Sequence, residues 1–217
     1  LLGEGWRCNF FIAAEPTDMG ICYEQKGGVW LELRVEGKAA HASRPWDGDN
    51  PLFALSAGLE ALSRRFPLLA SEGWRTTATP TRMHSAEGAP NQIPPYALLT
   101  LDIRHIAEDT PDSIVAAVQE CFPTGRIIAR RLVSPLVNSA DDPAIKALAE
   151  VNARMRGQPT VVYREHFASD ARFYSDAGIP AVCFGPVGHG LHADDEWVEI
   201  ASLVQCYEVL RAYMEGL

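Results

Sequence analysis

The sequence predicts an α/β fold that is interrupted by an α+β insert of the ferredoxin-like kind. Short, nearly continuous apolar runs at 8–14 and 179–184 are typical of strands buried on both faces. Between them, residues 29–36 alternate apolar and polar side chains, which indicates a half-exposed antiparallel strand. From 29 to 133 the expected order is strand, helix, strand, strand, helix, strand, the split βαβ pattern with a four-stranded antiparallel sheet and two helices.

The insert is expected to span 27–133, because the strand pattern changes at Gly27-Gly28. Asn50 before Pro51, and Thr110 before Pro111, are each a capping residue followed by proline, which predicts two helix starts. The insert is then expected to contain helices from 51 to about 65 and from 111 to about 121, with further strands at 76–84, 97–103 and 125–133.

The flanking segments, 1–26 and 134–217, are expected to form the α/β domain. Asp142 before Pro143 predicts a helix that reaches about residue 156. Strands alternating with helices return after it, which favours a parallel sheet. The expected elements are a strand at 161–163, a helix beginning within 168–173 with Ser169 or Asp170 as its cap, the buried strand at 179–184 and a closing helix at 197–213.

Composition restricts the partners of the chain. Its 217 residues are 47% hydrophobic and 22% charged, as in globular domains, and the net charge of −9 argues against nucleic acid or anionic membrane partners. No apolar run approaches the roughly 20 residues that span a bilayer. Five scattered cysteines favour free thiols and a reducing cytoplasm. The first residue is Leu1 rather than methionine, so we expect a piece of a longer polypeptide.

Residues 188–197 form a glycine-flanked loop with two histidines and three carboxylates, directly after the buried strand at 179–184. Such loops carry the chemistry of α/β folds, and neutral imidazole is the commonest metal ligand. The competing interpretation is a solvated acidic loop with incidental histidines. Glu15 also follows an apolar strand, although Glu-Pro is common in surface turns. His41 lies among small residues, and Asn91 lies in a stiff loop between prolines.

Taken together, four blocks resemble the metallopeptidase M20 family of zinc amidohydrolases, in the order of that family. Each block alone is weak, but the four in order, with an insert of the expected topology, cover essentially the whole chain. The blocks are Ala14-Glu15-Pro16-Thr17; 37–45 with Gly48 and Asn50; 91–94 with 101–104; and Ser169-Asp170-Ala171 through Gly185-Pro186 to 192–196.

The resemblance implies a role for each matching position. Glu15 would hold one zinc ion and His192 the other, with Asp195 and Glu196 behind them. His41 would be the histidine of the lid, or dimerisation, domain that stabilises the oxyanion in the partner subunit of a homodimer. The substrate contacts implied by the resemblance are Asn91, Ser169, the Gly185 backbone and Arg104. For Arg104, an ion pair with Asp102 is an equally good alternative.

The implied reaction is hydrolysis of an amide in an N-acyl amino acid or small peptide by water that two zinc ions activate. Cobalt and manganese fit the same ligand types. Two departures from the family matter. Phe167 and Ala168 stand where the family has small glycines, and the N-terminal half that carries the general base and the remaining ligands is absent. We therefore expect the isolated chain to bind zinc poorly and to be inactive.

Two other interpretations stay open. The chain could be a non-catalytic dimerisation or binding module derived from that family. It could also be an unrelated ferredoxin-like binding domain with an α/β appendage, in which case the placement of Glu15 and His192 after buried strands is a coincidence.

Overall fold

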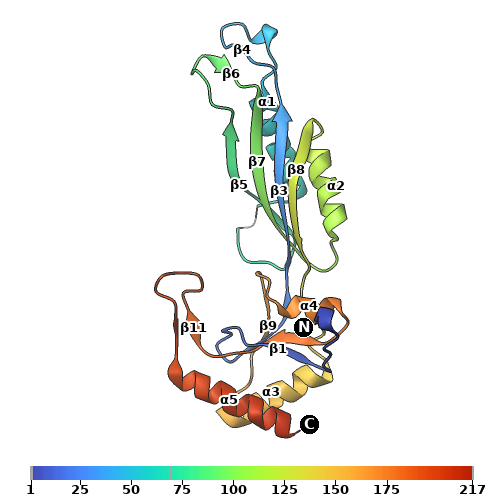
Figure 1. Cartoon of the computed structure of the whole chain (residues 1–217), viewed down its shortest axis with the longest axis vertical. Coiled ribbons are helices and arrows are strands. Elements are labelled where there is room, and N and C mark those ends of the chain that lie inside the picture. The colour runs from blue at the N-terminus through green and yellow to red at the C-terminus, as the bar shows by residue number, and fades with distance from the viewer. Residues whose placement is uncertain (1, 69, 217) are drawn as a thin grey trace. The chain divides into compact units, whose positions relative to one another are not determined.

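The computed structural model describes residues 2–68 and 70–216, and the chain divides into two compact units. Unit 1 contains the residues up to Lys26 and those from Ser134 onward, and unit 2 is Gly27–Val133. Figure 1 shows the elements of both units. Among residues 2–68 and 70–216, none of the helices has the length and apolar character that crossing a bilayer requires.

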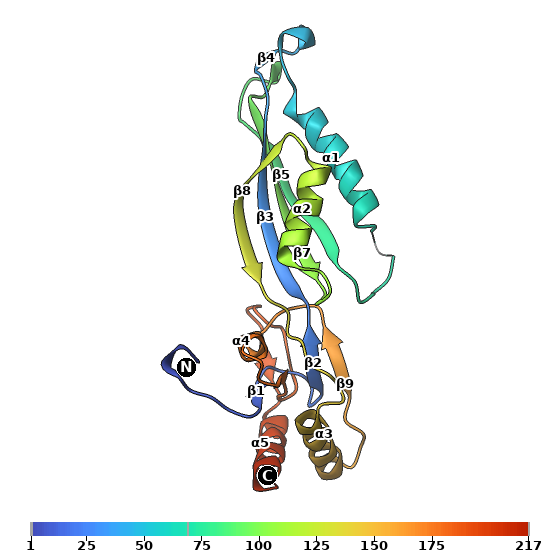
Figure 2. The same ribbon diagram turned by 90° about the vertical axis from the view of Figure 1, so that its right-hand side faces the viewer.

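Unit 2 has the four-stranded antiparallel sheet and two helices that the sequence predicts. Its strands lie in the order β5-β7-β3-β8, and every neighbouring pair is antiparallel. Helices α1 and α2 cover one face of this sheet (Figure 2) and enclose a core that includes Leu33, Leu99 and Val118. The elements are β3 (Gly27–Glu36), α1 (Pro51–Arg65), β5 (Thr77–Ser85), β7 (Tyr96–His105), α2 (Pro111–Cys121) and β8 (Gly125–Val133).

The capping residues read from the sequence begin the long helices. Asn50 accepts a hydrogen bond from the Leu52 amide at 3.0 Å, and Thr110 accepts one from the Ser113 amide at 3.2 Å. Each side chain satisfies one of the amides that a helix N-terminus leaves unpaired. Asp142 does the same for α3 (Pro143–Arg156) by accepting from the Ala144 amide at 2.9 Å.

Unit 2 also contains a small ladder that the sequence analysis did not anticipate. Strand β4 (Ala40–His41) pairs antiparallel with β6 (Gln92–Ile93), so that His41 lies opposite Gln92. A short 3-10 helix, η2 (Pro45–Asp47), follows β4. Two-residue strands carry too little hydrophobic pattern to be recognised without their partner. The ladder brings two candidate loops, 41–50 and 87–95, together.

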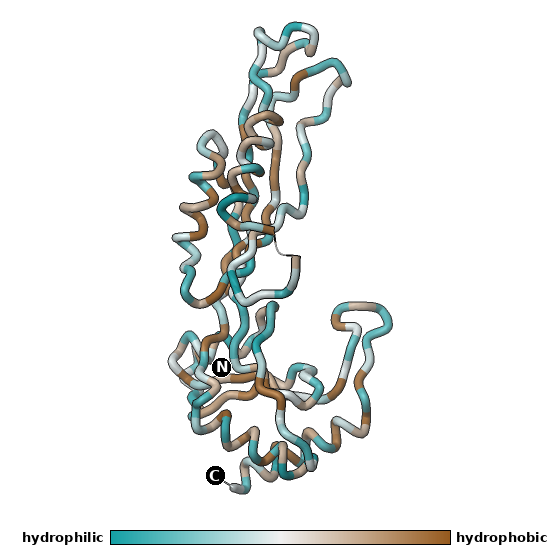
Figure 3. Tube along the Cα trace, turned by 180° about the vertical axis from the view of Figure 1, so that it is seen from behind, coloured by the Kyte–Doolittle hydropathy of each residue, from teal (hydrophilic) through white to brown (hydrophobic). Residues whose placement is uncertain are grey.

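Unit 1 is a three-layer arrangement around a four-stranded sheet in the order β1-β10-β2-β9. One face packs against α3 and α5 through residues such as Ile145, Val182 and Val209, and the other packs against α4 through Ala171 and Cys183. The two long helices at the bottom of Figure 3, α3 and α5, carry both apolar and polar residues. Besides α3 and the two hairpin strands described below, its elements are η1 (Leu2–Glu4), β1 (Phe11–Ala13), β2 (Ile21–Gln25), β9 (Val162–Glu165), α4 (Ala171–Asp176), β10 (Ala181–Cys183) and α5 (Ile200–Glu215).

Two expectations for this sheet were wrong. The sheet is mixed rather than parallel, because the unpredicted strand β2 runs antiparallel to β10 while β1 and β9 run parallel to their neighbours. The apolar run at 8–14 contributes only β1, whose three residues are half-buried instead of buried on both faces. Strand β1 ends the observed strand order, and an edge strand has a neighbour on one side only.

The segment at 188–197 is a hairpin rather than a plain loop. Strand β11 (Gly188–His189) pairs antiparallel with β12 (Trp197–Val198), and the hairpin extends away from the four-stranded sheet (Figure 1). The closing helix therefore begins at Ile200, and not at Trp197 as expected, because Trp197 and Val198 are engaged in the hairpin. Helix α4 has Asp170 at its N-cap position, but no side-chain capping bond is made there.

Candidate functional site

In unit 1, Glu15 and Gly185 lie side by side at the carboxyl ends of two parallel strands. Ala13 of β1 pairs with Cys183 of β10, so the two chains leave the sheet together. A Cβ atom placed on Gly185 would lie 2.2 Å from the carbonyl oxygen of Glu15. Only glycine permits this approach of the two backbones. The carboxylate of the half-buried Glu15 is thus carried by a tightly packed backbone.

Thr17 locks the turn that follows Glu15. Its buried hydroxyl donates to the Gly20 carbonyl at 2.7 Å and accepts from the Gly185 amide at 2.9 Å. The Met19 amide donates to the Gly185 carbonyl at 3.0 Å. The turn holds Asp18 and Met19 at φ of 52° and 63°, in the left-handed region that non-glycine residues rarely occupy. Thr17 has no role that could be predicted from the sequence, where its only signal is its place after Glu15-Pro16.

Ser169 lies inside unit 1. Its hydroxyl is buried, donates to the Gln25 side-chain oxygen at 2.7 Å, and is 3.0 Å from the Cys183 sulfur. The Ser169 amide donates to the same Gln25 oxygen at 3.0 Å. Burial raises the pKa of Cys183 to about 11, which keeps this sulfur a neutral thiol near pH 7. The Ser169 hydroxyl thus connects Gln25 of β2 to Cys183 of β10.

His192 lies in the exposed loop between β11 and β12, and its backbone φ is 64°. At the base of this hairpin the His189 ring meets Trp197 edge to face at 5.2 Å, and its Nε2 lies 3.9 Å from an Asp18 carboxylate oxygen. The turn after Glu15 and the hairpin that carries His192 are therefore neighbours. A pocket of about 310 Å³ is lined there by Pro16, Pro186, Gly188, His189, Leu191, Glu196, Trp197 and Val198.

The residues present do not complete a metal centre. Glu15 and His192 are of donor types that zinc accepts, but a catalytic zinc usually has three protein ligands. Across 2–68 and 70–216, no three histidine, cysteine, aspartate or glutamate side chains are arranged to hold an ion. Glu15 and His192 could therefore hold a catalytic zinc ion only together with further ligands.

In unit 2 the structure brings His41 and Asn91 together. The Asn91 carboxamide lies 3.0 Å from His41 Nε2, and the Ser43 hydroxyl lies 2.8 Å from His41 Nδ1. The backbone amide of Ala42 donates to the Asn91 carbonyl at 2.8 Å, which fixes one loop on the other. Both ring nitrogens of the exposed imidazole therefore have polar neighbours.

Arg104 lies on the face of the unit 2 sheet opposite the helices. Its guanidinium pairs with Asp102 at 2.8 Å and lies 4.7 Å from the centre of the Trp30 ring. The Trp30 indole N–H donates to the same carboxylate at 3.0 Å. This is the ion pair with Asp102 that the sequence analysis held open as the alternative role.

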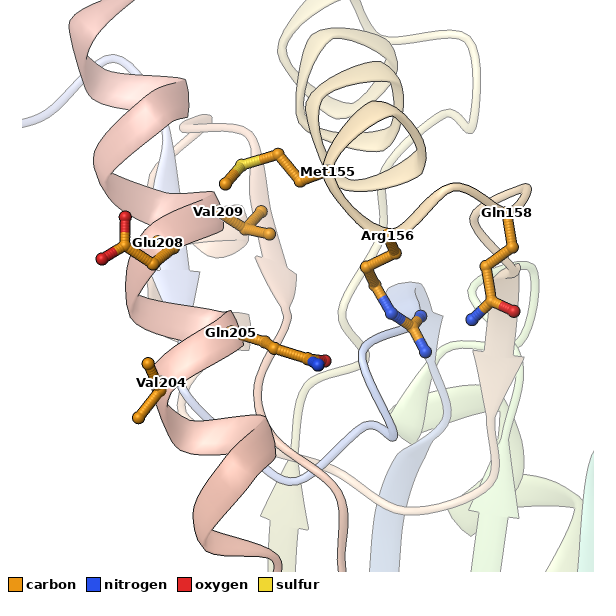
Figure 4. A pocket seen from close by; sticks show the side chains of 7 residues that line it. All are labelled: Met155, Arg156, Gln158, Val204, Gln205, Glu208 and Val209. Carbon is orange, nitrogen blue, oxygen red and sulfur yellow. The ribbon is translucent and has the colours of Figure 1, made fainter.

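A second hollow of unit 1 contains none of the predicted site residues. It has a volume of about 360 Å³ and lies between α3 and α5, where Arg156 and Gln205 extend into the space between the helices (Figure 4). The other lining residues are Met155, Gln158, Val204, Glu208 and Val209.

Residues 23–125 match the family described as peptidase dimerisation domain, M20_dimer. Among curated proteins, the chain is 29% identical over 210 residues to a putative succinyl-diaminopimelate desuccinylase of Mycobacterium tuberculosis, covering 94% of this chain and 58% of that protein. It is 27% identical over 224 residues to a succinyl-diaminopimelate desuccinylase of Magnetococcus marinus, covering 97% and 58%. The chain thus spans less than two thirds of the length of these relatives.

Solved structures share the fold. Aminopeptidase PepT from Bacillus cereus superimposes with a TM-score of 0.83 at 18% identity, over 98% of this chain and 58% of that chain. An M20 family metallo-carboxypeptidase from Sulfolobus solfataricus superimposes with a TM-score of 0.71 at 15% identity, over 96% and 63%. Both similarities run through unit 1 as well as unit 2.

Proposed function

Because residues 23–125 match the M20 peptidase dimerisation domain and the whole chain resembles succinyl-diaminopimelate desuccinylases, we propose that this chain is the larger part of an amide hydrolase of the M20 family. The proposed substrate is an N-acyl amino acid or a small peptide, and N-succinyl-diaminopimelate heads the candidates because relatives are named for that reaction. A divalent metal, bound in the complete protein, would activate the water that attacks the amide.

The observation that carries this proposal is the pairing of Glu15 with Gly185. Glu15 follows β1, and its backbone carbonyl packs against Gly185, which follows the parallel strand β10. Its carboxylate would therefore lie at the edge where α/β sheets bind their ligands. The backbone contact fixes the start of the Glu15 side chain, and the His189–Asp18 contact keeps the loop of His192 nearby. Glu15 and His192 would each give one ligand to a metal site. Residues outside these 217 would supply the other ligands.

His41 is proposed as a donor to the oxyanion of the tetrahedral intermediate. An imidazole N–H aimed at developing negative charge lowers the barrier without becoming a base itself. A homodimer through unit 2 would bring His41 to the active site of the partner subunit, and two-fold dimers are the commonest assembly. Asn91, Ser169, Gly185 and Arg104 remain proposals as substrate contacts.

The test compares this chain with its complete protein. The coding sequence upstream of Leu1 is read for an in-frame extension, and both proteins are assayed with zinc on N-succinyl-diaminopimelate, N-acetylornithine and dipeptides. We expect turnover of an N-acyl substrate only by the complete protein. Two zinc ions per chain and turnover by the 217 residues alone would contradict the division of the site.

In the complete protein, His41→Ala should lower kcat by about 10²-fold, the usual cost of losing one oxyanion donor, with zinc content unchanged. His84→Ala is the control, because His84 is an exposed residue of β5 outside the proposed site. A turnover number equal to that of the unaltered protein would remove His41 from the site.

One observation favours a second candidate function. Because no three ligating side chains converge in the described residues, the chain could act as a dimerisation or binding module without hydrolysis. A start codon at Leu1, together with a stable dimer and no activity on the substrate panel, would favour this candidate.

A further inference from the structure

The turn that follows β4 places Ser43 beside the ring of His41. The Arg44 amide donates to the His41 carbonyl at 2.8 Å, which closes a four-residue turn over 41–44. Ser43 is the third residue of that turn, and it contacts the histidine two positions earlier. The geometry is that of an Asx turn, with imidazole in place of the carboxamide.

Two groups of Ser43 converge on one ring nitrogen. The Ser43 backbone amide donates to His41 Nδ1 at 3.2 Å, and the Ser43 hydroxyl is 2.8 Å from the same atom. A backbone N–H can only donate, so Nδ1 has to accept and carries no proton. The hydroxyl then donates to Nδ1 as well. In a neutral imidazole whose Nδ1 accepts, the proton is on Nε2.

The proton on Nε2 also fixes the orientation of Asn91. In the structure the Asn91 side-chain nitrogen, Nδ2, is the atom 3.0 Å from Nε2, whereas an Nε2–H needs an acceptor. The oxygen and nitrogen of a carboxamide exchange places by a half turn, so hydrogen bonding decides which of them faces the ring. The Nε2–H tautomer therefore requires the half-turned carboxamide, in which the Asn91 oxygen takes the place of Nδ2 beside Nε2 and accepts the hydrogen bond.

We infer that Ser43 is a positioning residue that holds neutral His41 in the Nε2–H tautomer, with the Asn91 oxygen as the resting acceptor of that N–H. The consequence for catalysis rests on the function proposed above. An Nε2–H can leave the Asn91 oxygen and donate to an oxyanion, whereas the other tautomer would present a lone pair to the negative charge. The contacts of Ser43 and Asn91 with the ring thus keep Nε2–H available as a hydrogen-bond donor before substrate binds.

The tautomer is measured directly by two-bond ¹H–¹⁵N spectra of the 217-residue chain labelled with ¹⁵N-histidine. The spectra are recorded at pH 8, where a free histidine side chain, with a pKa of about 6.5, is neutral. The His41 signals are assigned by their loss in His41→Gln, and exposed His84 is the internal reference. We expect an unprotonated Nδ1 and a protonated Nε2 for His41. A protonated Nδ1 would overturn the inference.

Three variants separate Ser43 from Asn91. Ser43→Ala removes the shorter contact and should shift the Nδ1 signal and lower the Nε2–H fraction. Ser43→Thr keeps the hydroxyl and should retain the native signals. Asn91→Ala should leave Nδ1 unprotonated and unshifted. The role of Ser43 would be refuted if Ser43→Ala kept the native signals. It would also be refuted if the tautomer changed in Asn91→Ala but not in Ser43→Ala. Circular dichroism checks that each variant is folded.

The catalytic consequence has a separate readout. In the complete protein, Ser43→Ala should lower kcat by less than His41→Ala does, with KM little changed, and Ser43→Thr should restore it. If His41→Ala leaves turnover unchanged, the proposed function of His41 fails while the tautomer measured in the chain still stands. If Nδ1 of His41 carries the proton, the inferred role of Ser43 is refuted, whatever activity the variants show.

Discussion

Replacing Gly185 by alanine is the sharpest perturbation of the candidate site that unit 1 offers. The added Cβ would lie 2.2 Å from the Glu15 carbonyl oxygen, whereas ordinary contact begins at 3.4 Å, so the two backbones have to separate by about 1.2 Å. The three atoms nearest to this Cβ, the Glu15 oxygen and the carbonyl carbons of Glu15 and Ala14, all belong to the backbone, so no side-chain rotation relieves the overlap. Overpacking of this kind costs about 1–3 kcal/mol.

The cost should appear in unit 1 and at the site itself. We expect the free energy of unfolding of unit 1 to fall by about 1–3 kcal/mol in urea titrations followed by circular dichroism. Hydrogen exchange read by mass spectrometry should show faster exchange of the Phe184 and Met19 amides, which donate to the Ala13 and Gly185 carbonyls. Exchange in unit 2 should not change.

Gly3→Ala is the matched control, because a Cβ there meets nothing within 4 Å. The same exchange of glycine for alanine should therefore leave the urea midpoint within error of the unaltered chain. If Gly185→Ala unfolds at the same urea concentration as Gly3→Ala, the close approach of Glu15 and Gly185 is not a constraint, and the reasoning fails.

Three further predictions follow from burial and from the two-unit organisation. Iodoacetamide at pH 8 should alkylate half-buried Cys8 before Cys183, because burial raises the pKa of Cys183 to about 11 and suppresses its thiolate. Peptide mapping measures both alkylation rates, and equal rates would contradict this prediction. Asn152→Ala should destabilise unit 1 by about 1–3 kcal/mol in urea titrations, since the buried Met19 carbonyl loses its 2.8 Å bond; an unchanged midpoint would refute it. A chain of residues 27–133 should fold alone and melt cooperatively, because it has its own sheet and core; a non-cooperative melt would show that it depends on unit 1.

The candidate site could be predicted from sequence only in part. Its members were identified by residue type and by position after strands, as with Glu15 and His192. The contacts that organise them could not be identified in this way. Thr17, Ser43 and Gln25 make hydrogen bonds of about 3 Å to residues that are distant in sequence or on the far side of a turn. A hydroxyl or carboxamide gives no periodic signal that would reveal such a partner.

The sequence by itself determined the elements whose cause is local. The caps Asn50, Thr110 and Asp142 begin helices because their side chains bond to amides two or three residues ahead. Period-two alternation at 29–36 gives a strand with one buried face, as in β3. Both effects act within a few residues and need no knowledge of the rest of the chain.

Tertiary structure decided what depends on partners far along the chain. Strand β2 and its antiparallel pairing with β10 make the sheet of unit 1 mixed, and the short apolar patterns of these two strands do not reveal the direction in which they pair. The pairing of β11 with β12 delays α5 to Ile200, and the pairing of β4 with β6 joins His41 to Asn91. These outcomes come from backbone hydrogen bonds between distant segments, which every non-proline residue can make and which no local sequence pattern specifies.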